Sequence, residues 1–320
     1  MEVPYRIRMM VPADLRVIGR RALPSAWTER RTIRRHLVVP DSLRPTPRGP
    51  GSVWGVAMMR NEEDTAEHVL EHLCSQDVDA LLVSDNGSTD GTRAILESVA
   101  AQFPLHIVED RLVSYAQGAK MTILADLARR SGADWVVPFD ADELWFAADR
   151  SVGGFLRTVD SDIVHARIHD VFPGPADDAD ETDPFMRLGR FDPEPFPVGK
   201  VAFRTNRLVN VAMGNLDVTR RGRRTDGLFI AHYPWRSFEQ MAAKLRHGRR
   251  ALAETTLPEL MGIHWRTAGA WSDDQLRAAW DDIVAGRAVD DLSWSPIGTL
   301  EDAHPGRWTT WQDERRPEPV

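Results

Sequence analysis

Short apolar runs alternate with amphipathic segments through the first half of the chain. The apolar runs, each the length of one buried strand, cover residues 53–58, 80–83, 105–108 and 135–139. The segments with apolar side chains at helical spacing cover residues 64–76, 92–101 and 117–130. Because strands that alternate with helices form parallel βαβ units, the pattern predicts an α/β fold with a doubly wound, mostly parallel sheet. Pro138 cannot donate a ladder hydrogen bond, so we place it at the last position of its strand.

The second half of the chain has a less regular pattern. Alternation predicts strands over residues 163–168, 200–204, 207–211 and 228–232. Ser237 and Ser272 each precede a glutamine by three residues, which predicts two helices opened by capping boxes. We therefore expect a nucleotide-binding part over 52–146, a mixed acceptor part over 147–235, and a helical extension over 236–320 that packs on the catalytic domain.

The first 51 residues form an arginine-rich leader that closes in a Pro/Gly stretch. Residues 1–50 contain eleven arginines and four acidic residues, a net charge of +7, whereas the whole chain carries a net charge of -8. The leader could contact an anionic membrane surface or an acidic partner, and it could equally form salt bridges to the acidic body of the same chain. The overall negative charge argues against a nucleic-acid partner.

Several classes of protein are excluded by composition. The single cysteine, Cys74, rules out an internal disulfide framework and a cysteine-rich metal site. No apolar run is long enough to span a bilayer, and residues 1–25 lack the pattern of a signal peptide. We expect a cytoplasmic protein, with peripheral contact at the inner face of the membrane if the leader binds lipid.

Polar clusters follow each of the four predicted strands of the first half. They are Arg60-Asn61-Glu62, Asp85-Asn86, Glu109-Asp110 and Asp140-Ala141-Asp142. Ligands of doubly wound sheets bind at the carboxyl ends of the strands, and these ends meet at one edge. The sequence therefore predicts one ligand site built from all four clusters.

Asp140 and Asp142 predict a cation at this edge. Two carboxylates one residue apart repel each other unless a cation or hydrogen-bond donors neutralise them. Oxygen ligands suit Mg²⁺ or Mn²⁺, held together with waters and substrate phosphates. His232, at the end of another predicted strand, could add a nitrogen ligand. Asp85 would face the ligand while Asp90 caps the following helix.

Phosphate-binding loops are absent from the sequence. Neither G-x-x-x-x-G-K-[ST] nor a G-x-G-x-x-G after the first strand is present. Side chains such as Lys120, Lys200 or Arg204, together with the metal, must then hold any phosphates.

His68, Glu71 and His72 match the H-x-x-E-H pattern of some zinc hydrolases. Both histidines lie largely off the apolar stripe of their helix, on a face that we expect to contact solvent. A zinc hydrolase is therefore kept as a remote alternative.

Three motifs in this order resemble the family 2 glycosyltransferases of GT-A fold. The motifs are Val56-Ala57-Met58-Met59-Arg60-Asn61-Glu62, Asp85-Asn86-Gly87-Ser88-Thr89-Asp90-Gly91-Thr92 and Phe139-Asp140-Ala141-Asp142-Glu143. A further segment, His232–Ser237 with Lys244, is similar to a segment of a bacterial subgroup. Asn86 departs from the family pattern, which often has a second aspartate there.

The resemblance implies transfer of a sugar, with inversion, from a nucleotide-diphosphate donor such as a UDP-sugar to an acceptor hydroxyl. Nucleotide-binding residues carried over from the motifs are Asn61, Glu62, Asp85, Lys120 and Asp140. Asp85 would contact the base and Asp140 the ribose or the metal. Asp142 would hold Mn²⁺ or Mg²⁺ with help from His232. A second alternative is a protein that binds nucleotide sugars without turning them over.

The general base should come from the second half of the chain. Near Gly214-Asn215-Leu216-Asp217 a related pattern has histidine where Leu216 stands. Asp217 is the predicted base and Asp226 the reserve.

Overall fold

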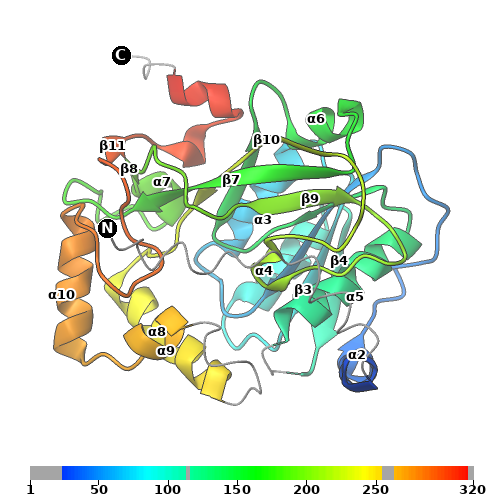
Figure 1. The fold of residues 1–320 in the computed structure, drawn as a ribbon, viewed down its shortest axis with the longest axis horizontal. Helices are drawn as coiled ribbons and strands as arrows, with labels where there is room; N and C mark the ends of the chain where they lie inside the picture. Colours follow the sequence, from blue (N-terminus) through cyan, green and yellow to red (C-terminus); the bar gives the residue numbers. More distant parts are fainter. Residues whose placement is uncertain (1–23, 113–115, 254–262, 316–320) are drawn as a thin grey trace.

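The computed structural model describes residues 24–112, 116–253 and 263–315. One mixed sheet with helices on both sides forms the body of the molecule (Figure 1). Its strands are β1 (Leu37–Val38), β2 (Val53–Met59), β3 (Ala80–Asp85), β4 (Leu105–Asp110), β5 (Trp135–Pro138), β6 (Glu143–Ala147), β7 (Ile163–Phe172), β8 (Arg190–Phe191), β9 (Lys200–Arg204), β10 (Arg224–His232) and β11 (Glu301–Asp302).

The helices flank the sheet or follow it in the chain. They are α2 (Pro24–His36), α3 (Ala66–Ser75), α4 (Thr92–Ala100), α5 (Gln117–Arg130), α6 (Val152–Thr158), α7 (Pro184–Arg187), α8 (Phe238–Ala253), α9 (Ile263–Ala268) and α10 (Asp273–Val284). Three short 3₁₀ helices complete the described elements: η2 (Met213–Asn215), η3 (Pro305–Arg307) and η4 (Trp311–Arg315).

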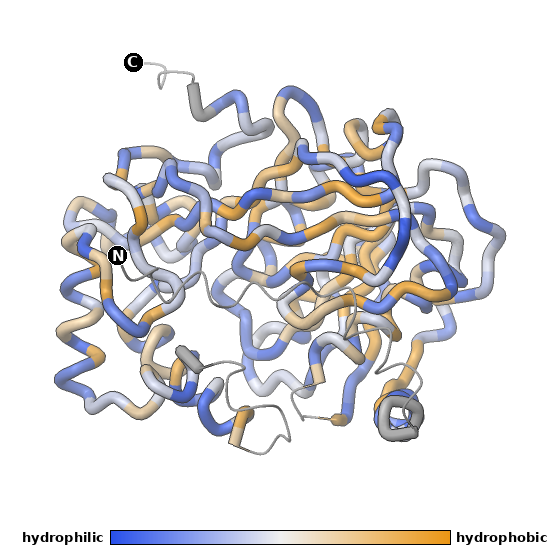
Figure 2. Tube along the Cα trace, in the orientation of Figure 1, coloured by the Kyte–Doolittle hydropathy of each residue, from blue (hydrophilic) through white to orange (hydrophobic). Residues whose placement is uncertain are grey.

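The first half of the chain confirms the predicted α/β fold. Strands β4, β3, β2 and β5 are neighbours in that order and pair in parallel. Nearly all side chains of β2, β3 and β5 are buried, because helices cover both faces of the sheet, whereas only half of those of β4 are. The hydrophobic strands therefore run through the interior, while hydrophilic residues collect in loops and on outer helix faces (Figure 2). Pro138 is the last residue of β5, as predicted.

Antiparallel pairs extend the sheet in the second half. Strand β9 pairs antiparallel with both β5 and β7, β10 pairs parallel with β7, and β6 pairs antiparallel with β10. Strands β7 and β10 consequently run in the direction of β5, so their carboxyl ends lie at the edge where the predicted ligand site falls. The sequence did not predict β6, which follows the Asp140–Asp142 turn directly.

Residues 207–211 do not form the predicted strand. Only Val211 pairs there, in an isolated bridge with Val218. The segment is instead a loop that returns to helix α5, where Val211 N donates to Thr122 Oγ1 at 2.9 Å.

The described part of the arginine-rich leader joins the body of the fold. Helix α2 contacts α5, and β1 adds an antiparallel edge strand to β4. Arg48 forms a salt bridge with the buried Asp134, which Arg204 also contacts at 2.6 Å. Arg48 thus takes the intramolecular option that the charge pattern left open.

Parts of the C-terminal region pack on the sheet. Helix α10 begins with the predicted capping box, in which Ser272 Oγ accepts from Gln275 N and the Gln275 side chain accepts from Ser272 N. Trp311 stacks on Phe229 of β10 with ring centroids 4.8 Å apart. Among the helices in the described residues, none is both long and apolar enough to cross a membrane.

Candidate functional site

The turn between β5 and β6 places a buried carboxylate at the edge where β5, β7 and β10 end. Asp142 follows β5 by four residues and is 8% exposed. Lys244 of α8 lies 2.5 Å from Asp142 Oδ2, His232 Nε2 lies 3.7 Å from the same oxygen, and Arg236 Nη1 lies 3.8 Å from it. Burial alone would raise the pKa of Asp142, but Lys244, His232 and Arg236 hold that pKa well below its usual range.

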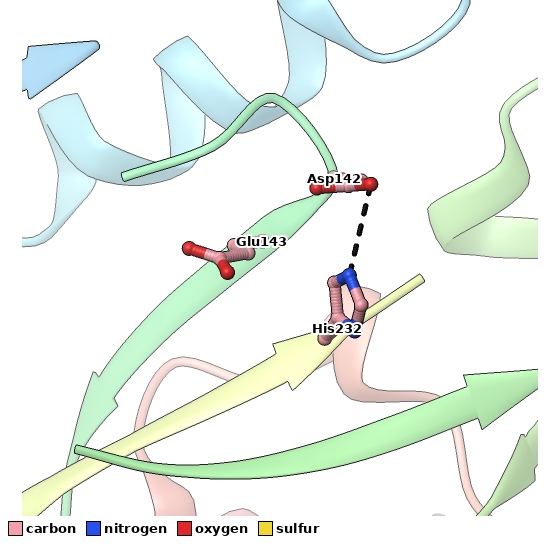
Figure 3. A group of neighbouring side chains, drawn as sticks. All are labelled: Asp142, Glu143 and His232. Carbon is pink, nitrogen blue, oxygen red and sulfur yellow. Dashed lines mark ion pairs between the residues drawn. The ribbon is translucent and has the colours of Figure 1, made fainter. Parts of the chain in front are cut away.

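His232 lies between two carboxylates. Its Nδ1 is 2.7 Å from Asp170 Oδ1 in β7, and its Nε2 faces Asp142 (Figure 3). Burial would lower the pKa of His232, but Asp142 and Asp170 raise it to about 9. An Asp170–His232 pair with Nε2 directed inward is the arrangement that orients a metal-binding imidazole. A cation and a proton would compete for Nε2, because only the neutral nitrogen ligates.

Asp140 belongs to a second cluster on the same turn. Lys200 Nζ is 2.5 Å from Asp140 Oδ2 and also contacts Glu143, and Asn215 Nδ2 donates to Asp140 Oδ1 at 3.3 Å. Glu143 Oε2 accepts from Asp140 N at 3.2 Å and from Trp145 Nε1 at 3.3 Å. Glu143 therefore braces the turn, while Asp140 is held by partners on both oxygens.

The charge balance of these clusters fits a divalent cation. Six carboxylates are linked by the contacts of the site, from Glu62, Asp64, Asp140, Asp142, Glu143 and Asp170. They outnumber the three permanent cations, Lys200, Arg236 and Lys244, even when the protonated His232 is counted with them. Within the described residues, the ligand atoms of Asp142, Glu143 and His232 form a group within 4.8 Å of one another. Glu143 is engaged on both oxygens, whereas the side-chain contacts of Asp142 among the described residues all fall on Oδ2, so Asp142 and His232 are the ligands that fit best. Mg²⁺ and Mn²⁺ suit this oxygen and imidazole set.

The predicted nucleotide-binding residues after β2 and β3 lie in one connected loop pair. Asn61 Oδ1 accepts from Thr89 N at 2.8 Å, and Glu62 N donates to Thr92 Oγ1 at 2.8 Å. Asp85 is buried and its Oδ1 accepts from Ser88 N at 3.0 Å. These contacts bring the first two motifs together beside the sheet edge.

Asp90 does not act as the predicted N-cap of α4. The N-cap residue is Gly91, which makes no side-chain capping bond. Asp90 instead accepts from Glu63 N at 3.3 Å and from Thr92 N at 3.0 Å, so it ties the two loops to each other.

Lys120 lies in a buried network rather than at an open surface. Its ammonium is 2.6 Å from Asp110 Oδ2 and also contacts Leu112 O. Asn86 Nδ2 donates to the same Asp110 carboxylate at 2.9 Å and to Leu112 O at 2.9 Å. Lys120 and Asn86 thus fix residues 110–112, and a direct contact of Lys120 with a nucleotide stays a prediction.

Asp217 is bound by Arg224 and by the backbone of Val218. Its Oδ1 is 2.9 Å from Arg224 Nη2 and accepts from Val218 N at 2.7 Å. Arg224 begins β10, eight residues before His232, whereas Asn215, two residues before Asp217, reaches Asp140 of the site. The reserve, Asp226, is exposed on the same early part of β10. The role of either residue as general base stays a prediction.

The two histidines of the H-x-x-E-H pattern do not face solvent as expected. His72 is 8% exposed, and its Nε2 is 2.8 Å from Trp145 O. His68 stacks on Phe185, and its Nδ1 is 2.7 Å from Asp183 Oδ2. Strand β6 and helix α7 cover this face of α3, so both rings serve packing, and the zinc alternative gains no support.

Four residues of the site were not predicted to take part in it: Asp170, Asn215, Arg236 and Lys244. Arg236 connects Glu62 (3.0 Å) and Asp64 (2.6 Å) to the Asp142 cluster, so it joins the first motif to the third. Its Nη1 is buried without a hydrogen-bond partner. The signal for Arg236 and Lys244 was present in the segment after His232. Asn215 stands in the Gly214–Asp217 segment, which the sequence marked for Asp217 alone, and nothing in the sequence marks Asp170.

The comparison with protein families agrees with this site. Residues 56–193 match the family described as Glycosyl transferase family 2, and this range holds Asn61, Asp85, Asp140 and Asp142. The match confirms the resemblance drawn from the three motifs and supports a glycosyltransferase. No curated protein matches the chain.

Solved structures of distant likeness include S. aureus TarS. The crystal structure of TarS 1-349 has a TM-score of 0.38 and 14% identity, with 68% of this chain and 69% of that chain covered. The complex of TarS 1-349 with UDP-GlcNAc has a TM-score of 0.37 and 13% identity, with 68% and 71% covered.

Proposed function

We propose that the protein is a metal-dependent, inverting glycosyltransferase that moves a sugar from a UDP-sugar to an acceptor hydroxyl. The observation that carries the proposal is the Asp142 cluster, a buried carboxylate among Lys244, Arg236 and His232 at the carboxyl edge of the sheet. A nucleotide diphosphate needs positive charge there, and the family match over residues 56–193 supports this class of donor.

Different residues of the site bind the base, the ribose and the diphosphate of such a donor. Asp85 accepts a hydrogen bond from the base, and Asp140, held by Lys200 and Asn215, accepts from the ribose. Mg²⁺ or Mn²⁺ held by Asp142 and His232 supplies positive charge to the departing diphosphate when bound. Arg236 and Lys244 add fixed positive charge at the same place, where charge develops as the sugar leaves.

A nucleotide-sugar-binding protein without turnover is the second candidate. The observation that favours it is the engagement of Asp217 with Arg224 and Val218, because these contacts occupy the carboxylate of the predicted base. The two candidates share the donor site and differ only in donor turnover.

A nucleotide panel tests the donor site. The melting temperature is measured with UDP, GDP and dTDP, each with and without Mn²⁺ and Mg²⁺. We expect UDP with a divalent ion to stabilise the protein most, by about 2.7 kcal/mol at a hundred times the dissociation constant. Failure of every nucleotide to raise the melting temperature in the presence of metal would refute both candidates.

Measurement of UDP release from UDP-sugars then distinguishes the transferase from the binding protein. Turnover that requires a divalent ion and falls at least a hundredfold in Asp142→Asn supports the transferase. Asp290→Asn, an exposed aspartate outside the site, is the matched control and should keep full turnover. Nucleotide binding without turnover of any donor would favour the binding protein.

A further inference from the structure

A strongly basic surface covers α2 and the adjoining part of α5. Its seven arginines, which we call the basic face, are Arg30, Arg31, Arg34 and Arg35 of α2, Arg129 and Arg130 of α5, and Arg207 of the loop after β9. Asp126 joins these elements through Arg34 at 3.6 Å, Arg129 at 2.8 Å and Arg130 at 2.9 Å. With Asp126 and Glu29 as the acids among them, the basic face carries a net charge of +5 on a chain of net charge -8.

The outward-facing arginines of α2 form no ion pairs or hydrogen bonds with the described part of the chain. Ile33 is buried against the body, and Arg31 lies about 200° around the helix from it, at 100° per residue. Arg31, Arg35 and Arg207 are exposed and have no ion-pair or hydrogen-bond partner among the residues that the structure describes. Their charge is therefore available to a partner outside the chain, unlike that of Arg48 and Arg204.

A small cavity opens between α2, α5 and the loop after β9. It has a volume of about 70 Å³, and Arg30, Arg34 and Arg207 line it together with Thr205 and Asn206. The lining offers guanidinium and amide donors on several sides, and Asp126 is its only acid. Such a set of donors suits a single phosphate group.

Exposed apolar side chains flank the basic face. Leu208, next to Arg207, is 70% exposed, and Val38 and Val39, directly after α2, are 42% and 39% exposed. In the described ranges, only two other large hydrophobic side chains, Leu216 and Ile297, have an exposed fraction close to that of Val39. Basic residues combined with exposed apolar ones are typical of surfaces that rest on an anionic bilayer. A soluble polyanion would gain no binding energy from these exposed apolar side chains.

We propose that the basic face docks on an anionic membrane surface, with a lipid phosphate in the cavity and Leu208 at the level of the acyl boundary. Helix α2 lies beside α5 at the end of the molecule opposite α10, so docking leaves the C-terminal helices free of the bilayer (Figure 1). The inference uses no residue of the nucleotide site and stands independently of the proposed function.

Vesicle sedimentation of the full chain tests the proposal. Phosphatidylcholine vesicles are compared with vesicles containing 30% phosphatidylglycerol, at low and high salt. We expect binding only to the anionic vesicles, with loss at high salt because the attraction is screened. The double variant Arg31→Glu/Arg35→Glu should reduce the bound fraction at least tenfold, and Leu208→Asp should reduce it severalfold.

A matched control uses the same change of charge elsewhere. Arg249 and Arg250 form an exposed pair on α8, and Arg249→Glu/Arg250→Glu should bind anionic vesicles nearly as well as the unaltered chain. Melting curves of all variants show whether each is folded. Equal binding to neutral vesicles, or unchanged binding of a folded Arg31→Glu/Arg35→Glu variant, would overturn the proposal. Stabilisation by inorganic phosphate without any vesicle binding would also overturn it, in favour of a free-anion site.

Discussion

His72 illustrates how burial changes the chemistry of a single residue. It is enclosed between α3 and β6, with Nε2 at 2.8 Å from Trp145 O and its ring edge-to-face with Phe146. Burial lowers its pKa from 6.5 to about 4, because the imidazolium would lose its hydration. Between about pH 4 and pH 6.5 the ring therefore stays mostly neutral in the folded protein, whereas it is mostly charged in the unfolded chain.

This shift predicts a loss of stability on acidification. Below pH 6.5 the unfolded chain binds a proton at His72 that the folded protein does not bind. The free energy of unfolding therefore falls as pH falls towards 4. The expected contribution between pH 7 and pH 5 is about 2 kcal/mol. Urea unfolding of the unaltered chain and of His72→Gln at both pH values measures it. The variant is less stable at pH 7 but should lose about 2 kcal/mol less on acidification; equal losses would contradict the assignment.

Asn86 shows a residue choice that its neighbours explain. Its amide donates to Asp110 Oδ2 and to Leu112 O in a buried environment. An aspartate there, as the family often has, would put a second carboxylate against Asp110 without that donor. The departure from the family pattern is therefore consistent with local hydrogen bonding, whatever its effect on the choice of base.

At the scale of elements, helix α5 shapes the site through the loop after β9. Gln117 Oε1 accepts from Gly214 N at 3.0 Å, and a side chain at Gly118 would meet Val211 O at 3.1 Å. Held in this way, Gly214 and Asn215 both adopt positive φ, 71° and 58°. Asn215 is 0% exposed, donates to Asp140 and leaves its Oδ1 without a partner. Strain maintained by its surroundings is common at functional sites.

Replacement of Asn215 by glycine separates strain from binding. Glycine relieves the left-handed backbone, which offsets part of the stability lost with the buried hydrogen bond, so we expect only a modest fall in the melting temperature. Asp140 loses a donor that orients it, so UDP should bind roughly tenfold more weakly in calorimetric titrations.

The control for this variant is Asp291→Gly. Asp291 has a φ of 62° and is exposed outside the site, so its replacement relieves a similar backbone without touching Asp140. It should leave UDP binding unchanged. Equal affinity of Asn215→Gly and Asp291→Gly would show that Asn215 does not orient Asp140.

On the scale of the whole molecule, the C-terminal region completes the core. Trp308 and Trp311 contact Phe146 of β6, Phe191 of β8 and, for Trp311, Phe229 of β10. Gln312 N donates to Ala148 O, and Gln76 Nε2 donates to Thr309 O. Aromatic residues far apart in the chain thus share one cluster, and the Gln76–Thr309 hydrogen bond joins residues 233 positions apart.

A truncation after Ala303 should therefore destabilise the entire fold. Loss of one buried tryptophan costs about 3–5 kcal/mol, and here Trp311 is removed together with the half-buried Trp308. We expect a melting temperature lower by ten degrees or more, with binding of a hydrophobic dye by the exposed phenylalanines. A chain truncated after Arg315 retains these contacts and should melt like the full chain. Unchanged melting of the shorter form would show that the cluster contributes little.

The sequence by itself determined the elements whose cause is local. Periodicity predicted β2 to β5 and α3 to α5, and the register of parallel units placed Asp85, Asp140 and Asp142 at one edge. The sequence also predicted the capping box at Ser272 and the end of β5 at Pro138, because backbone geometry and hydrogen bonding within a few residues decide them.

Only the tertiary structure decided which side chains meet. Arg236 and Lys244 reach Asp142 from α8, Asp170 orients His232 across β7 and β10, and Asn215 reaches Asp140 through a loop held by α5. The same packing drew Asp217 to Arg224, buried His72, and tied the described part of the leader to β4 and Asp134. These outcomes depend on contacts between distant segments, and no periodicity or spacing along the chain encodes which partners a charged or polar side chain will find.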